Sequence, residues 1–152
     1  YWLLEQACMT TPALGEAAGY VPYMALVIPV FSGLRLAKFN IDERQTTSFI
    51  GMHIPAHALF WASIGYAFNS AVPMDSIEFI AGTIVAAILF SSLLVSEVPM
   101  FSLKVKSLAW KGNELRYILV AGAVVFVTLF GVLGIAGTVI LYITLSFFNK
   151  RR

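Results

Sequence analysis

Long apolar stretches alternate with short polar ones along the whole chain. The apolar stretches cover about residues 20–40, 54–69, 77–96 and 117–149. The first and third have the length of a helix that crosses a bilayer, whose hydrocarbon core is about 30 Å thick, and the second is short for one. The pattern therefore predicts an all-α fold, a polytopic bundle of transmembrane helices.

The last apolar stretch predicts two helices rather than one. Residues 117–149 carry no charge, and as one helix they would measure about 50 Å, far more than the hydrocarbon core. Gly131 and Gly134 at the centre of the stretch favour a turn there. With this pair, the chain is expected to have about five spans.

Prolines and polar residues predict where several helices begin. Pro22 lies near the start of the first span, and Pro29 lies inside it, where a kink is expected. Pro55 suits the first turn of the second span. Asp75 and Ser76 can cap the third.

The start of the chain predicts the end of an upstream element. Residues 1–4 are apolar, with no initiator Met and no basic leader, so they are expected to end an earlier helix. Residues 5–19, with Pro12 and Gly15, are expected to form a loop. The beginning of the protein is therefore expected to be missing from this chain.

The composition supports a membrane location. The chain is 59% hydrophobic and 12% charged, whereas soluble domains are about half apolar and about a quarter charged. Its mean hydropathy is +0.84. The single cysteine, Cys8, excludes an internal disulfide and a cysteine-based zinc site. The net charge of +2 gives no reason to expect nucleic acid as a partner.

The positions of the charges predict the orientation. With five spans, all ten Lys and Arg residues fall on one side of the membrane. They are Arg35, Lys38, Arg44, Lys104, Lys106, Lys111, Arg116, Lys150, Arg151 and Arg152. The other side holds Glu5, Glu16, Asp75 and Glu78 and no basic residue. By the positive-inside rule the basic side is cytoplasmic, so a multi-pass protein of the cell membrane is expected.

A small polar group at the end of the first span is the candidate substrate site. Arg35 and Lys38 are three residues apart and share a helical face, and Asn40 follows within a turn. Arginine offers a fork of donors for phosphate or carboxylate, and lysine adds a point charge. The alternative is that Arg35 and Lys38 are ordinary interfacial anchors.

Other candidate chemistry is weaker. His53 and His57 are four residues apart, but no Glu lies between them, so packing or interfacial roles are favoured over a metal site. Asp42 and Asp75 are predicted on opposite sides of the membrane, so they cannot form a divalent metal site. No catalytic residue and no metal ligand is assigned within this chain.

Three motifs, in order, resemble a known enzyme family. They are SGLRLAKFN at 32–40, FIGMHIPA at 49–56 and VPMFSLK at 98–104. They resemble the "(A/G)LRLARFN", "F-x-G-(L/M)-P-x-P-A" and "VP-x-x-S-x-K" segments of bacterial CDP-diacylglycerol–serine O-phosphatidyltransferases. Lys38 stands where Arg is frequent, and His53 stands where Pro is usual. Residues 1–152 would then form the C-terminal part of one integral-membrane CDP-alcohol phosphatidyltransferase domain.

The resemblance implies a reaction in phospholipid biosynthesis. CDP-diacylglycerol and L-serine would give phosphatidylserine and CMP at the cytoplasmic face. The family signature, D-x2-D-G-x2-A-R-x8-G-x3-D-x3-D, is absent, so the divalent cation (Mg or Mn) would be bound by residues outside this chain and the fragment alone would be inactive. Arg35 would bind a substrate phosphate or the serine carboxylate, with Lys38 supporting and Asn40 orienting. Related enzymes are commonly dimers, so a homodimer is among the expected arrangements.

Other functions remain open from the sequence. A relative that uses glycerophosphate or inositol would share the upstream signature. A transporter or channel subunit predicts ionisable residues near the membrane midplane, whereas the charges here avoid the span centres. A non-catalytic membrane scaffold is the third alternative.

Overall fold

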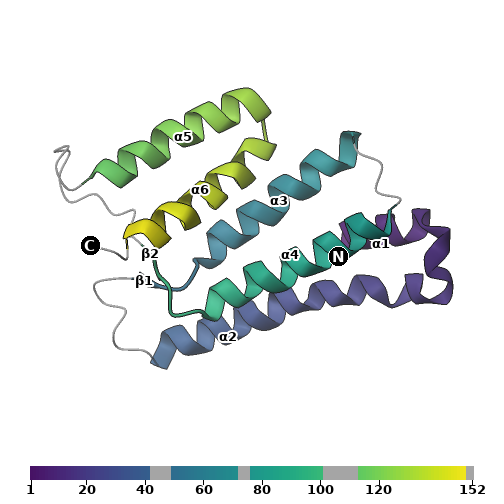
Figure 1. The fold of residues 1–152 in the computed structure, drawn as a ribbon. Helices are drawn as coiled ribbons and strands as arrows, with labels where there is room; N and C mark the ends of the chain where they lie inside the picture. Colours follow the sequence, from purple (N-terminus) through teal and green to yellow (C-terminus); the bar gives the residue numbers. More distant parts are fainter. Residues whose placement is uncertain (42–48, 72–75, 101–112, 150–152) are drawn as a thin grey trace.

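The computed structural model describes residues 1–41, 49–71, 76–100 and 113–149, and nearly all of them are helical. The predicted all-α class is confirmed. The long helices lie side by side, so that their ends gather at two ends of the molecule (Figure 1). The elements are α1 (Trp2–Thr10), η1 (Pro12–Gly19), η2 (Val21–Leu26), α2 (Val27–Ile41), β1 (Phe49–Ile50), α3 (Ile54–Ala71), α4 (Ile77–Val95), β2 (Pro99–Met100), α5 (Glu114–Phe130) and α6 (Leu133–Asn149).

The predicted loop over residues 5–19 is wrong. Helix α1 continues to Thr10, and the 3-10 segment η1 follows it, broken at Gly15 with φ of 50°. The reason is a buried stripe on α1, because Leu4, Ala7 and Cys8 lie on one face and pack against α4 and η2. This apolar stripe outweighs the turn residues that follow it.

Pro29 lies inside the first span, as predicted, and this span is helical from Val21 to Ile41. The first span begins as the 3-10 segment η2 and becomes α-helical at Val27, two residues before Pro29. Pro29 is therefore the third residue of α2, in the first turn after the 3-10 segment.

The starts of α3 and α4 agree with the sequence. Pro55 is the second residue of α3. The Ser76 hydroxyl accepts a hydrogen bond of 3.1 Å from the Phe79 N–H and caps α4. The other predicted cap, Asp75, lies outside the described residues.

The last apolar stretch is two helices, as predicted, with the turn at Gly131. Gly131 has φ of 57°, and its N–H donates to the Val127 carbonyl at 2.9 Å. Gly134 brings the two helices together, since a Cβ there would lie 2.2 Å from the Phe126 carbonyl oxygen. At Gly122, a Cβ would lie 2.4 Å from Cδ2 of the Leu141 side chain on α6.

A short antiparallel pair, β1 with β2, was not predicted. Phe49 pairs with Met100, and Ile50 pairs with Pro99. The next residue, Gly51, has φ of 82°, and a Cβ there would lie 2.6 Å from the Leu94 carbonyl oxygen. The segments that enter α3 and leave α4 are thereby joined, so two of the three sequence motifs meet in space.

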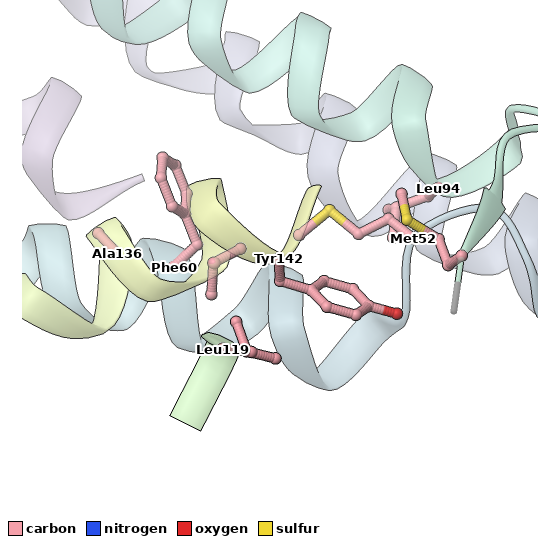
Figure 2. Packing of buried hydrophobic residues seen from close by; sticks show 8 residues of the cluster. Met52, Phe60, Leu94, Leu119, Ala136 and Tyr142 are labelled. Carbon is pink, nitrogen blue, oxygen red and sulfur yellow. The ribbon is translucent and has the colours of Figure 1, made fainter. Parts of the chain in front are cut away.

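Two apolar clusters hold the helices together. The larger contains Met52, Phe60, Leu94, Met100, Leu119, Ala136, Val139 and Tyr142, and it joins the β pair to α3, α4, α5 and α6 (Figure 2). The smaller contains Leu4, Ala7, Cys8, Ala25 and Ile80. Cys8 is 2% exposed and serves as a small apolar residue of this second cluster.

Two helical stretches in the described chain, Val21–Ile41 and Ile77–Val95, are long and apolar enough to cross a membrane. Only 11% and 22% of their apolar windows are buried within the protein. Large apolar side chains also face outward on α5, for example Val124, Leu129 and Phe130.

The end of the molecule that holds the β pair also holds the ends of α2, α4 and α6 and the starts of α3 and α5 (Figure 1). Arg35, Lys38 and Arg116 belong to the helix segments at this end. The other predicted cytoplasmic cations lie outside the described residues. They are Arg44, Lys104, Lys106, Lys111, Lys150, Arg151 and Arg152.

Candidate anion-binding site

A pocket of about 240 Å³ lies between α2 and the start of α3. Its walls are mostly apolar carbon, from Leu36 and Phe39 on α2 and from Ile54 and Pro55 on α3. Arg35 and His53 complete the lining, one from each side. The pocket therefore combines apolar walls with two basic side chains.

Arg35 is the buried cation of the site. Only 5% of the residue is exposed, and its guanidinium carbon lies 5.8 Å from the centre of the Phe39 ring, within the range of a cation–π contact. A simple interfacial anchor extends its charged group to water. The burial of Arg35 fits a binding role better than an anchoring one.

His53 lies at the entry to α3, between Arg35 and Tyr142. The Tyr142 hydroxyl from α6 is 3.4 Å from His53 Nδ1, a long hydrogen bond whose direction depends on the tautomer. The same hydroxyl can donate to a neutral imidazole or accept from a protonated one. Tyr142 therefore positions His53 in either charge state.

Arg35, His53 and the start of α3 are the polar features at the pocket. Burial, and then the nearby Arg35 guanidinium, lower the pKa of His53 below its usual value of 6.5. The N-terminal end of α3, at Ile54 and Pro55, adds the partial positive charge of a helix dipole. Arg35 and the start of α3 would each favour an anion in the pocket, whereas His53 would do so only in its protonated form.

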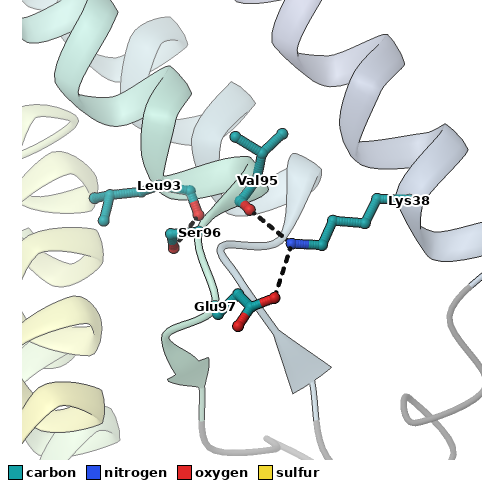
Figure 3. Close-up of polar contacts among 5 residues, drawn as sticks. All are labelled: Lys38, Leu93, Val95, Ser96 and Glu97. Carbon is teal, nitrogen blue, oxygen red and sulfur yellow. Dashed lines mark hydrogen bonds and ion pairs between the residues drawn. The ribbon is translucent and has the colours of Figure 1, made fainter.

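Lys38 does not line this pocket. Its ammonium donates to the Val95 carbonyl at the end of α4, at 3.0 Å, and lies 3.6 Å from a Glu97 carboxylate oxygen (Figure 3). The side chain therefore joins α2 to the end of α4. Lys38 and Arg35 both lie on α2, as predicted, but only Arg35 lines the pocket.

Asn40, the third predicted site residue, is exposed in the last turn of α2. It is not among the residues that line the pocket. Of the predicted trio, only Arg35 therefore contributes to the pocket, and the substrate roles of Lys38 and Asn40 stay predictions.

The described residues do not fit a metal ion. No group of three or more His, Cys, Asp or Glu side chains in the described ranges is placed to hold one. His57 is 2% exposed and accepts a hydrogen bond from Trp61 Nε1 at 3.3 Å, so it is a packing residue. The Mg or Mn ion that the resemblance implies has no ligand set in this part of the chain.

Comparisons of the chain with protein-family models, curated proteins and solved structures found no match.

Two residues of the site were not assigned to it from the sequence. His53 was interpreted as a packing or interfacial residue, although it lies in a quoted motif beside Pro55. Tyr142 is 89 residues further along, and nothing in its local sequence separates it from the other aromatics of the spans. Only the packing of α6 against α3 brings it to His53.

Proposed function

We propose that this protein is a membrane-embedded enzyme that acts on a phosphate-containing lipid. The observation that carries the proposal is a buried arginine on the wall of an apolar pocket, at the end of the molecule where the basic residues of α2 and α5 gather. Apolar walls suit the hydrocarbon part of a lipid, and a guanidinium suits its phosphate.

The particular reaction that we propose is the transfer of a phosphatidyl group from CDP-diacylglycerol to L-serine. The serine hydroxyl oxygen forms a bond to the phosphorus next to the diacylglycerol. The bond from that phosphorus to the bridging oxygen breaks, CMP leaves with this oxygen, and the hydroxyl proton is released to water. The three sequence motifs support this choice. Two of them, FIGMHIPA and VPMFSLK, are joined where Phe49–Ile50 pairs with Pro99–Met100, beside the pocket residue His53.

We propose a five-span layout for the same protein, with the site at the cytoplasmic face of the cell membrane. The β-pair end would face the cytoplasm, and the turn at Gly131 would face outward. This places the pocket at headgroup depth, where the diphosphate and serine arrive from water while the acyl chains stay in the bilayer.

In this proposal Arg35 binds a phosphate of CDP-diacylglycerol or the carboxylate of serine. Lys38 holds α2 against the end of α4 and so keeps Arg35 in place. A divalent cation would neutralise charge at the diphosphate. Residues other than the described ones would bind this cation.

The test is an activity assay of the full-length protein, reconstituted with CDP-diacylglycerol and isotopically labelled serine. Release of CMP and formation of phosphatidylserine are expected. Glycerol 3-phosphate and inositol should be poor acceptors, and a preference for either would replace serine in the proposal. No CMP release with any of these alcohols would refute the proposed function.

Arg35→Gln should lower kcat/KM by about a hundredfold or more, the usual effect of losing a buried charged contact to substrate. Arg116→Gln is the matched control. Arg116 lies on α5 at the same end of the molecule and contacts Asn113 rather than the pocket. It should keep activity within about threefold of the wild type. Equal losses in both variants would argue against a specific role for Arg35.

A further inference from the structure

The proposed transfer reaction gives His53 no role. His53 lines the same pocket as Arg35, and the Arg35 guanidinium is near enough to act on its charge. Two neighbouring basic groups disfavour each other's charged forms, and an anion between them favours both. The pair therefore has the chemistry of an anion site whose total charge depends on whether the site is occupied.

The surroundings of His53 allow it to change charge. From α6, Tyr142 offers a hydroxyl that serves either protonation state. From α2, the neighbouring charge is Arg35. On its own side, His57 lies one turn further along α3, and its N–H donates to the His53 carbonyl at 3.1 Å. Near the end of α4, the Glu97 carboxylate lies against Lys38.

The pocket also limits the chemistry of its ligand. Four of its six lining residues are apolar, which suits an amphiphilic molecule better than a free ion. A phosphodiester of a lipid has the apolar part and a negative charge that does not titrate near neutral pH. Its charge is a partner for both Arg35 and a protonated imidazole.

We propose that Arg35 and His53 together bind the phosphodiester of a lipid, and that His53 takes up a proton from water when this ligand binds. The lipid identity rests on the proposed function, but the proton uptake does not require catalysis. Because burial and Arg35 lower the pKa of His53 in the empty pocket, the ligand must raise it again. Binding should therefore tighten as the pH falls through the range between the two pKa values.

The test is NMR of ring-labelled histidine in the full-length protein, in micelles of a neutral detergent. The signal that is missing from His53→Gln assigns His53, and His53→Asn serves if that variant does not fold. The probe is phosphatidylglycerol, a phosphodiester lipid, added at a few molecules per protein so that the micelle surface stays nearly neutral. Dimethyl phosphate, a phosphodiester without acyl chains, is the control.

Phosphatidylglycerol is expected to raise the pKa of His53 by about one unit, which corresponds to about tenfold tighter binding to the protonated protein. Phosphatidylglycerol should not raise the pKa of His57, because His57 packs against Trp61 and does not line the pocket. Arg35→Gln should abolish most of the rise. An equal rise with dimethyl phosphate would show that the site binds a phosphodiester without need of a lipid, and would overturn the lipid part of the proposal.

The proposal is overturned if phosphatidylglycerol leaves the pKa of His53 unchanged, or raises it equally in Arg35→Gln. Its failure can be separated from failure of the proposed function. Transferase activity without a pKa change at His53 would remove the proton uptake and leave the enzyme. A pKa change without any transferase activity would leave a lipid-phosphate site on a protein of another kind.

Discussion

Lys38 and Glu97 form an ion pair of 3.6 Å between α2 and the segment that leaves α4. The same ammonium donates to the Val95 carbonyl at 3.0 Å, one of the last carbonyls of α4. Helix ends leave carbonyls without intrahelical partners, and a cation there is favoured by the helix dipole. The contact is therefore a C-terminal cap for α4 that is supplied by a different helix.

Substitutions at these two positions should have unequal effects. Lys38→Met should cost about 1 kcal/mol, because it removes a charged hydrogen bond that is about one-third exposed. Glu97→Gln should cost less than about 0.5 kcal/mol, because the Glu97 side chain is 71% exposed. Thermal unfolding in detergent micelles measures both. A larger loss in Glu97→Gln than in Lys38→Met would contradict the capping role.

Lys38→Arg separates charge from shape in activity assays. If Lys38 acts only as a positive charge near the site, this variant should keep activity within about threefold. A loss of tenfold or more in kcat, without loss of stability, would mean that the shape of Lys38 matters to the reaction.

Gly51→Ala should destabilise the protein by several kcal/mol. Gly51 has φ of 82°, and the added Cβ would lie 2.6 Å from the Leu94 carbonyl oxygen and 2.9 Å from that of Ser96. Gly65→Ala is the matched control, since Gly65 lies in α3 with open space around its Cα. It should be neutral or stabilise by up to about 1 kcal/mol. Chemical unfolding compares the two, and equal stability would show that the backbone at position 51 tolerates a side chain.

The proposed layout predicts the accessibility of two engineered cysteines. Asn40→Cys, at the exposed end of α2, should react with a membrane-impermeant thiol reagent only from the cytoplasmic side. Val132→Cys, in the turn between α5 and α6, should react only from the other side. The native Cys8 is buried and should react from neither. Labelling of both new cysteines from one side would rule out the five-span arrangement.

The stability of the folded protein should depend on pH through His53. Because the pKa of His53 is lowered on folding, the unfolded chain binds the proton more readily. Stability should be full above the usual pKa of about 6.5 and fall as the pH drops from there towards the folded value. His53→Gln should reduce this slope. An unchanged slope in unfolding measurements from about pH 5 to 8 would mean that His53 titrates alike in both states.

Much of the helical plan followed from the sequence by itself. Apolar runs longer than a turn or two can satisfy their backbone groups in an apolar setting only as helices, so α2, α3 and α4 were predictable. The turn at Gly131 followed because a single helix over 117–149 is too long for a bilayer. Proline and serine positions predicted the starts of α3 and α4, since their effects act within a single turn.

Only the tertiary structure decided how the site is assembled. Arg35 and Lys38 share a helical face in sequence, yet Arg35 lines the pocket while Lys38 caps α4, because their partners come from different helices. The β pair and the approach of Tyr142 to His53 join residues that are far apart in the chain. Local patterns carry no information about such contacts, because these depend on which helices pack together and at what register.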